Sequence, residues 1–523
     1  MSIAHQTTAG DGWDIIVIGS GVGGLTAGAL LARYGYRVLV CEAHSVPGGA
    51  AHGFDRSGFR FDSGPSLFSG LADRHSPNPL RQVLNALEVD LGWLQYNTWG
   101  CHLPEGHFET EVGADQFCEV LQALGRPEAV AQWRELQRVM EPLAAASVAL
   151  PTAALRWNLG IFQTLTPFLP QLLSQLPQVQ RLTRPFSQIS DPVITDPFLR
   201  NWLDLLCYLL SGLPAQGTIA AEMAFMFADW YRPGVQLDYP KGGSGALVAT
   251  LVRGLEKWGG VLRCRASVAE IWVERNQTRG VKLQNGEVLE ATTAVISNAS
   301  SWDTVKLLPE GAGSPRFRQH RSTLPPCPSF MHLHLGIRAT GLDPNLACHH
   351  IVVNDWAAGV TAPQNVVLIS IPSLLDPDLA PPDCHTIHVY TPGNEPYGPW
   401  AGLDRNGPAY QNLKAQRAQV MWQALERVIP DVRDRLQVSL VGTPLTHARF
   451  LRRHQGSYGP ALWAGQSQFP GPKTPIQGLL CCGDSTFPGI GLPAVAASGL
   501  IAAHTIAPVA QHLTLLKRLS LIP

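Results

Sequence analysis

A glycine-rich run, GSGVGG at residues 19–24, stands directly after an apolar segment near the N-terminus. In such a run Gly19 permits a tight turn, Gly21 lets the backbone approach a pyrophosphate, and Gly24 lets the following helix pack close to the strand. Gly23 belongs to the same phosphate-binding set. The pyrophosphate would lie at the helix N-terminus, where unpaired N–H groups and the helix dipole favour an anion. These residues are therefore predicted to bind the phosphates of a dinucleotide.

The elements around this turn have the order that a dinucleotide fold requires. The sequence predicts a strand at 14–18, a helix at 24–34 and a second strand at 37–41, which ends at Glu42. A carboxylate there accepts both hydroxyls of an adenosine ribose and would repel a 2′-phosphate, so NADP is disfavoured. A glycine motif alone is weak evidence in a chain with 50 glycines, but this order of elements makes it specific.

Three further glycine-rich joints lie far apart in the chain. One spans 48–66, another is PKGGSG at 240–245, and the last runs from LLCCGD at 479–484 to Pro493. Paired glycines leave backbone donors uncovered, so a ribityl-phosphate chain can run over them. Joints spread over the whole chain suit a long cofactor, and FAD fits them better than NAD. The predicted FAD contacts in these joints are Gly48, Gly49, Ala50, Gly64, Pro65, Ser66, Gly483, Asp484, Gly491, Leu492 and Pro493.

The last two joints also carry predictions about their neighbouring elements. Asp484 would bond to the ribityl or pyrophosphate part of FAD. A helix that starts near Pro493 would direct its positive end at O2 and N1 of the flavin and stabilise the anionic reduced ring. After the middle joint, the sequence predicts a strand pair at 266–273 and 280–283, with a tight turn at 285–286.

Composition narrows the class of partner. The 523 residues carry 39 basic and 40 acidic side chains without a local Lys/Arg run, so nothing indicates nucleic acid. Only 15% of residues are charged and 45% are hydrophobic, which indicates a lipid-like ligand or a membrane surface. The ten cysteines lack paired short spacings, so we expect a reducing, cytoplasmic or stromal-type compartment with no disulfide framework and no zinc site.

Residues 15–32 form an uncharged stretch long enough to raise the question of a transmembrane helix or a signal peptide. Five glycines within it argue against both. Residues 1–13 also lack the basic side chains that a signal peptide carries. We therefore expect neither a signal peptide nor a transmembrane helix.

The segment from Val148 to Ile189 is rich in Leu, Phe, Pro and Gln, and its charged residues are Arg156, Arg181 and Arg184. Its prolines exclude one long spanning helix. Short apolar helices in a membrane interface, with arginines at the level of the headgroups, have this composition. The wall of an internal tunnel and ordinary core helices can have the same composition. If the helices do lie in a membrane interface, the protein is peripheral to a membrane.

The whole chain resembles the FAD-dependent carotenoid desaturase and isomerase family, which includes bacterial phytoene desaturases and the prolycopene isomerases of oxygenic phototrophs. The Gly19 run and the segment GDSTFPG at 483–489 carry the match at the two ends. The block TPLTHARFL at 443–451, with GSYGP at 456–460, is similar to the isomerase branch. The region from about residue 71 to 232 matches loosely.

The resemblance implies an α/β fold. A Rossmann-like FAD-binding domain of the glutathione-reductase and amine-oxidase type would carry an inserted α+β substrate domain and a helical region that could contact a membrane. FAD would be noncovalent, with Glu42 on the adenosine ribose and Val268 offering its backbone to the adenine. The implied boundaries are 12–70, 235–310 and 470–510 for the FAD-binding domain, and 71–234 and 311–469 for the substrate-binding and helical domain.

For activity, the resemblance implies an FAD-dependent oxidoreductase that acts on a long polyene, as a carotenoid desaturase or a cis–trans carotenoid isomerase. Alternatives are a retinol-saturase-like or other prenyl-lipid oxidoreductase, and a prenyl-lipid escort protein without flavin. Ala50 stands where amine oxidases carry arginine, which disfavours that activity. Ile490 stands where the isomerases often have glutamine. The sequence does not indicate an oligomeric state.

Two groups of polar residues remain. A polyene offers no polar handle, so catalysis is expected to fall to the flavin, with His447 and Arg449 as the only candidates to orient the ring or carry a proton. His332 and His334 share one face of a predicted strand, and His388 lies with His385 in another. Imidazoles two apart can converge on a metal, but no carboxylate or cysteine spacing completes a ligand set. We therefore predict no metal, and sheet histidines with hydrogen-bond partners.

Overall fold

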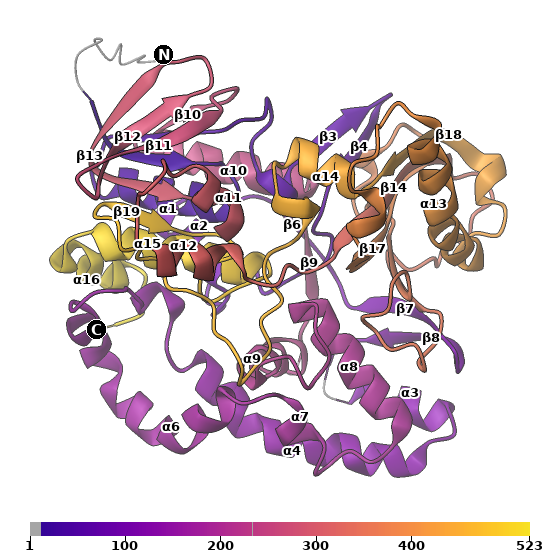
Figure 1. Cartoon of the computed structure of the whole chain (residues 1–523). Helices are drawn as coiled ribbons and strands as arrows, with labels where there is room; N and C mark the ends of the chain where they lie inside the picture. Colours follow the sequence, from indigo (N-terminus) through magenta and orange to yellow (C-terminus); the bar gives the residue numbers. More distant parts are fainter. Residues whose placement is uncertain (1–11, 114, 233, 523) are drawn as a thin grey trace.

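The computed structural model describes residues 12–113, 115–232 and 234–522. Two large β-sheets stand side by side above a layer of helices (Figure 1). Residues 1–11, on which part of the signal-peptide argument rests, lie outside the described residues. Among the described helices, none combines the length and the apolar character needed to cross a membrane.

The first sheet is built around the predicted dinucleotide fold. Its strand order is β10–β2–β1–β13–β12–β11, and β19 pairs with β13. The pairs β10–β2, β2–β1, β1–β13 and β13–β19 are parallel, whereas β11, β12 and β13 are antiparallel. The bounds are β1 Trp13–Ile18, β2 Val38–Cys41, β10 Val261–Arg263, β11 Val268–Glu274, β12 Gln277–Leu283, β13 Val288–Ser297 and β19 Leu479–Cys481.

The predicted elements of this sheet are present with small shifts. The first helix begins two residues earlier than expected, because Gly21 has an extended conformation and caps it. The turn at 285–286 joins β12 to β13 and does not close the β11–β12 pair as predicted. Arg275 and Asn276, with φ of 49° and 60°, make the β11–β12 turn instead.

Helices cover the first sheet at very close range. A Cβ on Gly24 would lie 2.2 Å from the carbonyl oxygen of Gly19, and one on Gly499 would lie 2.4 Å from that of Gly23. Side chains at these positions would push the helices off the sheet, so glycine is required for the packing. The helices on this side are α1 Val22–Arg33, α2 Pro79–Leu87, α10 Gly243–Lys257, α11 Ser301–Lys306, α12 Pro315–Ser322, α15 Leu492–Ile506 and α16 Val509–Arg518.

The second sheet has the order β18–β14–β17–β16–β15–β7–β8. Met331, Leu333 and Leu335 of its strand β14 pack against the helix α13 (Pro408–Val428). The alternate residues, among them His332 and His334, therefore face the other side. The strands are β7 Thr98–Leu103, β8 Gly106–Glu111, β14 Ser329–Arg338, β15 His349–Val353, β16 Val366–Ser370, β17 Cys384–Glu395 and β18 Leu436–Gly442, and the short helix α14 is Pro444–Phe450.

Two small sheets connect the large ones. One is the hairpin of β3 and β4, and the other has the order β5–β9–β6. Their bounds are β3 Gly53–Arg56, β4 Phe59–Asp62, β5 Phe68–Ser69, β6 Trp93–Tyr96 and β9 Leu237–Pro240.

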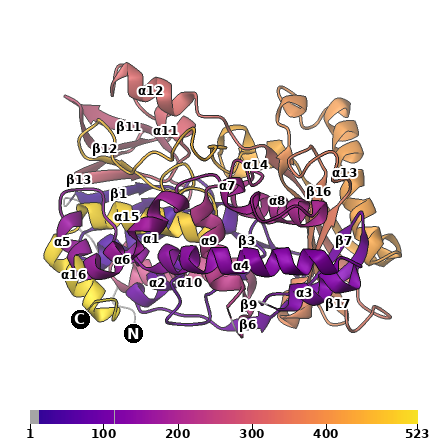
Figure 2. The same cartoon turned by 90° about the horizontal axis from the view of Figure 1, so that it is seen from below.

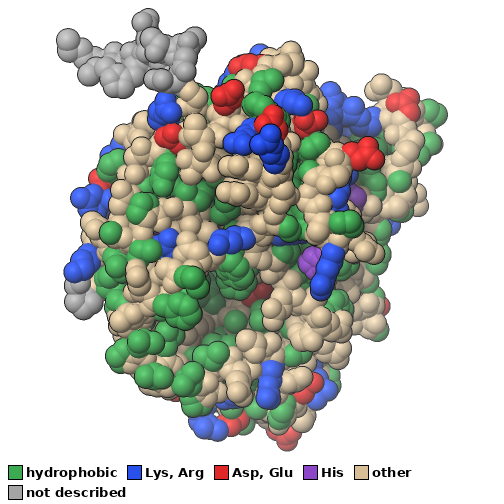
Figure 3. Space-filling model, turned by 60° about the vertical axis from the view of Figure 1, so that its left-hand side comes forward, with side chains coloured by type: hydrophobic (Ala, Val, Ile, Leu, Met, Phe, Trp, Pro, Cys, Tyr) green, Lys and Arg blue, Asp and Glu red, His purple; other side chains and the backbone are tan. Residues whose placement is uncertain are grey.

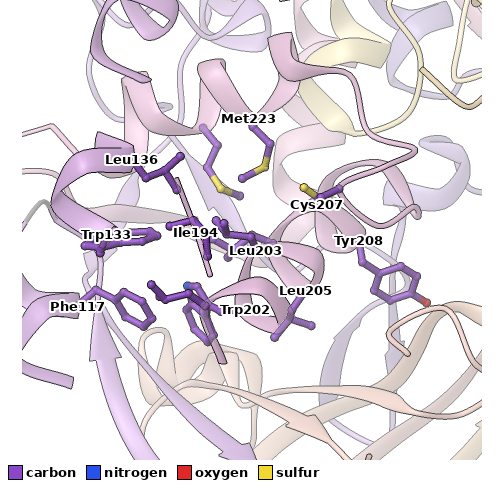
Figure 4. Close-up of a cluster of buried hydrophobic side chains, with 14 of the residues drawn as sticks. Phe117, Trp133, Leu136, Ile194, Trp202, Leu203, Leu205, Cys207, Tyr208 and Met223 are labelled. Atoms are coloured by element: carbon purple, nitrogen blue, oxygen red, sulfur yellow. The ribbon is translucent and has the colours of Figure 1, made fainter. Parts of the chain in front are cut away.

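The helical layer has an apolar core of its own. Phe117 stacks on Trp202 and meets Trp133 edge to face (Figure 4), with ring centroids 4.8 Å apart in both pairs. In the view from below, α4 runs across this layer beside α8 (Figure 2). The layer comprises α3 Gln116–Ala123, α4 Pro127–Val148, α5 Ile161–Leu165, α6 Leu169–Leu182, α7 Ser187–Ser190, α8 Pro197–Ser211 and α9 Ala220–Trp230.

The first sheet draws its strands from three segments of the chain, residues 13–41, 261–297 and 479–481. The second sheet and the helical layer take up the intervening stretches. The exact domain boundaries stay a prediction.

Several buried histidines are kept neutral by the fold. Burial lowers the pKa of His349 to about 3 and the pKa of His350 and His512 to about 4, from an ordinary value of 6.5. Between these values the unfolded chain binds protons that the folded chain excludes. The free energy of unfolding therefore decreases as pH falls through 6.5.

We expect these three histidines together to lower the free energy of unfolding by about 4 kcal/mol between about pH 7.5 and 5.5. Thermal unfolding monitored at several pH values measures this loss. His75→Gln removes an imidazole that is 97% exposed and should leave the pH dependence unchanged. A midpoint that stays constant over this range would contradict the expectation.

Candidate functional site

One cavity of about 550 Å³ is lined by all but one of the glycine-rich joints predicted from the sequence. The turn after β1, the end of β2, the paired glycines at 48–49 and the segment after β19 all contribute to its walls. The joint at 240–245 does not line it. Segments from both ends of the chain and from its centre therefore meet at one site.

Most of the predicted cofactor contacts lie on this cavity. Gly23, Gly24 and Pro493 do not line it. The two glycines face the packed interior of the fold, and Pro493 follows the lining residue Leu492 in the first turn of α15. The predicted residues that line it are Gly19, Gly21, Glu42, Gly48, Gly49, Ala50, Gly64, Pro65, Ser66, Val268, Gly483, Asp484, Gly491 and Leu492.

Glycines keep the phosphate side of the cavity bare. A Cβ on Gly21 would lie 2.6 Å from Nδ2 of Asn298, and one on Gly64 would lie 2.3 Å from the carbonyl oxygen of Ala50. Gly48 has φ of 114° and pairs with Gly21 in an isolated bridge. The backbone thus borders the cavity over a stretch without side chains, which is what a pyrophosphate requires, while the N–H of Gly48 itself donates to the carbonyl oxygen of Ser20 at 3.0 Å.

Glu42 stands at the end of β2 and is held in place from two sides. One carboxylate oxygen accepts hydrogen bonds from the backbone N–H of Ser20 at 2.8 Å and its hydroxyl at 2.6 Å. The other accepts from the backbone N–H of His44 at 2.8 Å. The carboxylate is therefore fixed on the cavity wall, where it can receive the hydroxyls of a ribose.

The N-terminus of α15 opens onto the same cavity. Gly491 caps it with φ of 98° and offers no side-chain hydrogen bond to the first turn. A Cβ at Gly491 would meet nothing within 4 Å. The unpaired N–H groups of this turn and the positive end of the helix dipole therefore face the space in which an anionic ring could be stabilised.

Sequence reasoning missed the cations of the site. Arg453 forms an ion pair with Asp484, donates to the carbonyl oxygen of Ser457, and lines the cavity together with Arg452 and Lys306. Cationic side chains beside a phosphate site offset its charge. The signal that could have revealed them is the arginine doublet at 452–453, directly after the block that resembles the isomerase branch.

The second sheet, α8 and the segments beside them supply a part of the cavity wall that is apolar and aromatic, unlike the phosphate side. Tyr390 bonds through its hydroxyl to Ser66 at 2.9 Å, and burial raises the pKa of the Tyr390 phenol to about 12. The rings of Phe330 and Tyr458 lie 3.9 Å apart. Among the described residues, no Asp, Glu, Lys, Arg or His belongs to this part of the wall, which consists of Tyr208, Leu209, Leu210, Ser211, Gly212, Cys327, Phe330, Leu368, Tyr390, Pro392, Gly393 and Tyr458.

His447 and Arg449 do not line the cavity, so this geometry does not support the prediction that either orients the flavin, which stays a prediction. His447 is buried behind Phe330, with ring centroids 6.0 Å apart, and burial lowers the pKa of its imidazole to about 3. Arg449 is exposed on α14 and lies over the ring of Phe450 at 5.2 Å.

The strand histidines lie where the sequence predicts, but only some of their nitrogens have partners. Nδ1 of His332 and Nε2 of His388 share a hydrogen bond of 2.6 Å, and Nε2 of His334 bonds to the carbonyl oxygen of Asp62 at 3.1 Å. The other nitrogens of His332 and His388 have no partner, which corrects the expectation of fully satisfied imidazoles. His385 bonds separately to Ser373 at 3.0 Å.

Comparison with known proteins decides the class. The sequence matches the family of flavin containing amine oxidoreductases over residues 22–507. The chain belongs to this family. The predicted FAD, the predicted enzyme class and the predicted α/β fold are thereby confirmed.

Individual relatives refine the comparison. The chain is 32% identical to prolycopene isomerase 1 of an Oncidium hybrid cultivar, a chloroplastic protein, over 97% of this chain and 86% of that one. It is 27% identical to the neurosporene-forming phytoene desaturase of Cereibacter sphaeroides over 96% of both. A putrescine oxidase bound to putrescine shares the fold, with a TM-score of 0.61 at 14% identity over 96% of this chain and 99% of that one. The resemblance to the carotenoid desaturase and isomerase family is therefore confirmed.

Proposed function

We propose that this protein is an FAD enzyme that converts a poly-cis carotenoid into its trans isomer. The identity with a prolycopene isomerase along nearly the whole chain supports the substrate class and the reaction. The apolar wall of the cavity is the observation that carries the proposal, because a polyene is the kind of ligand that needs no polar partner. The substrate would lie along this wall, against the part of the cavity that holds the flavin.

The residues around the cavity would have separate roles. We assign the phosphates to the backbone at Gly21 and Gly48, the ribose to Glu42, and the middle of the cofactor to Asp484 with Arg453. When bound, FAD supplies a ring that can donate or accept electrons at the substrate. Phe330, Tyr390 and Tyr458 would pack against the polyene and exclude water, and the α15 N-terminus would stabilise negative charge on the ring.

A second feature of the wall separates this proposal from amine oxidation. An amine substrate has a charged or ionisable nitrogen, which is costly to bury unless a carboxylate or another polar group pairs with it. The wall has no carboxylate among its described residues, and the hydroxyl of Tyr390 is already bonded to Ser66. A hydrocarbon chain has no polar group that would be left without a partner on this wall.

The experiment is an anaerobic assay of the FAD-loaded protein with poly-cis lycopene in lipid vesicles. With photoreduced flavin we expect all-trans lycopene to form without consumption of an electron acceptor. Stoichiometric reduction of an acceptor, with a longer conjugated chain as product, would show desaturation and overturn the isomerase assignment. Conversion of retinol but not of the carotenoid would overturn the substrate class.

The same substrate class leads to a membrane partner. The segment from residue 152 to the end of α6 exposes a set of large apolar side chains: Trp157, Leu159, Phe162, Leu169, Leu173, Leu176 and Val179, with exposures of 42%, 83%, 72%, 47%, 62%, 56% and 42%. Leu169, Leu173 and Leu176 follow one another on one face of α6, which has no buried residue. Hydrophobic side chains gather on the lower part of the face shown in Figure 3. We propose that this exposed apolar segment docks on the lipid surface from which the substrate comes.

The charges of this segment are consistent with docking, with one correction. No acidic residue stands between Pro142 and Ser190, so nothing there would be repelled by anionic lipids. Arg184 is exposed, as expected for a residue at the level of the headgroups. Arg156 is not, because it is buried and donates to the carbonyl oxygen of Ala507 at 2.8 Å.

The double variant Phe162→Asp/Leu173→Asp tests the docking surface. It removes two exposed apolar side chains whose insertion is worth about 1.5 kcal/mol or more each, so vesicle binding should weaken about 100-fold or more. Val288→Asp is the matched control, since Val288 is 49% exposed on a strand of the first sheet. Co-sedimentation with vesicles of mixed anionic and neutral lipid measures the difference. Equal binding by all three proteins would contradict the docking surface.

A further inference from the structure

Three buried imidazoles come together on one face of the second sheet. His332 and His334 lie on β14 and His388 lies on β17, where strand pairing places His388 opposite His334. The ring centroid of His388 lies 4.9 Å from that of His332 and 4.5 Å from that of His334. One ring nitrogen of each residue lies within 4.8 Å of one ring nitrogen of both others.

Three ring nitrogens in and beside this histidine cluster lack hydrogen-bond partners among the described residues. Nε2 of His332, Nδ1 of His388 and Nε2 of the neighbouring His447 are buried without a hydrogen bond. A buried polar atom without a partner costs about 1–3 kcal/mol, and a native fold that keeps several of them together calls for a water or an ion. These are not the nitrogens through which His332 and His388 face each other, so they show that the cluster is incompletely satisfied but do not by themselves mark the position of a ligand.

The cofactor cannot be that ligand. None of these histidines lines the cavity, and aromatic rings that do line it cover them. Tyr390 stacks on His388 with centroids 4.6 Å apart, and Phe330 stacks on His332 at 5.8 Å. The histidines form a separate site, one layer of rings behind the substrate wall.

We propose that His332, His334 and His388 bind one divalent transition-metal ion, with zinc as the first candidate. Neutral imidazole is a favoured ligand of zinc, copper, nickel and iron. Gly442, which pairs with His332 on the neighbouring strand β18, has no side chain and so leaves room beside that ring. The ion would tie β14 to β17 and hold the ring-lined wall of the cavity in place.

The hydrogen bonds already present favour metal ligation. The carbonyl oxygen of Asp62 accepts from Nε2 of His334, which keeps the proton on that nitrogen and leaves the Nδ1 lone pair available. A backbone carbonyl behind a ligand histidine is the usual outer partner in metal sites. The buried carboxyl group of Asp62 accepts hydrogen bonds from Tyr239 and Ser244, which fixes this residue behind His334.

Ion binding requires one local change. Nδ1 of His332 and Nε2 of His388 are 2.6 Å apart, whereas two nitrogens bound tetrahedrally at 2.0–2.1 Å are separated by about 3.3 Å. The rings must part by about 0.7 Å and also turn, because all three are parallel to within 10° and their lone pairs do not yet converge. The proton that His332 and His388 share must move to the other nitrogen of the ring that held it. No proton is lost, because both imidazoles are neutral before and after.

Metal content of the FAD-loaded protein, purified without metal-affinity resin, is the direct test. We expect about one bound ion per chain in the wild type and less than a tenth of that in His388→Phe, which keeps an aromatic ring beside Tyr390 but has no nitrogen. His349→Gln is the matched control, because His349 is a buried imidazole of the same sheet with one unpartnered nitrogen outside the site. Its metal content should equal that of the wild type. FAD measured on the same samples reports cofactor loss separately.

A titration with Co²⁺ gives an independent readout on the wild type. Bound in a tetrahedral nitrogen site, Co²⁺ should give visible ligand-field bands, and a zinc chelator should lower the thermal midpoint of the wild type but not of His388→Phe. A wild type that binds no zinc, copper, nickel, iron or cobalt would overturn the proposal, whether or not the variant folds. So would a folded His388→Phe that keeps its ion.

Discussion

Replacing Gly21 by alanine is expected to abolish most FAD binding and to leave the protein folded. The added Cβ would lie 2.6 Å from Nδ2 of Asn298, a side-chain atom that can move aside. The methyl group itself stays on the cavity wall, between the backbone and the space where a pyrophosphate must approach it. We expect the FAD dissociation constant to rise at least tenfold, a loss of about 1.4 kcal/mol, as measured by flavin content and FAD titration.

Two other glycine variants separate a loss of FAD binding from a loss of stability. Gly24→Ala places a Cβ 2.2 Å from a backbone oxygen that cannot move, so it should lower the free energy of unfolding as well as FAD content. Gly398→Ala is the control, because a Cβ there would meet nothing within 4 Å. If Gly21→Ala retained FAD like the wild type, the phosphates would have to lie elsewhere in the cavity.

Replacing Arg453 by methionine is expected to have the second large effect. The Arg453 side chain is 17% exposed and forms an ion pair with Asp484, which is 13% exposed. Without it, a poorly hydrated carboxylate would face the phosphates of FAD with no cation to offset the charge. We expect FAD affinity to fall by about 3 kcal/mol, which is about 100-fold.

A double-mutant cycle shows whether the pair acts as a unit. Arg453→Met/Asp484→Asn removes both charges, so we expect it to bind FAD better than Arg453→Met alone. Arg452→Met removes the neighbouring arginine, which is exposed and bonds to Ser267, and should change FAD affinity by less than about 1 kcal/mol. Additive effects of the two single changes would show that the ion pair does not set the charge of the site.

The nucleotide half of the site could be predicted because its signals are local. A tight turn, a bare backbone and a terminal carboxylate each depend on residues that are neighbours in the chain, as at Gly19, Gly21 and Glu42. The errors in this half are local too. The helix begins at Val22 because the extended backbone of Gly21 caps it, and no side-chain type signals that.

Contacts between remote segments were not predictable in the same way. Asp484 meets Arg453 across 31 positions of sequence, and His332 meets His388 across 56. The second contact depends on the register between β14 and β17, which alternating apolar residues do not fix. The composition of residues 148–189 indicated apolar helices, but which side chains are buried depends on packing against α4 and the C-terminal helices.

The order in which the sheet is assembled sets a limit on when the protein can become a flavoprotein. The segment after β19 and the N-terminal turn of α15 come from residues 483–495, yet they form one wall of the cavity that begins at Gly19. A ribosome-bound chain would therefore have an incomplete groove until this segment has been translated. Flavin capture is thus expected to follow the synthesis of this segment, and a shortage of the vitamin should leave a pool of colourless polypeptide.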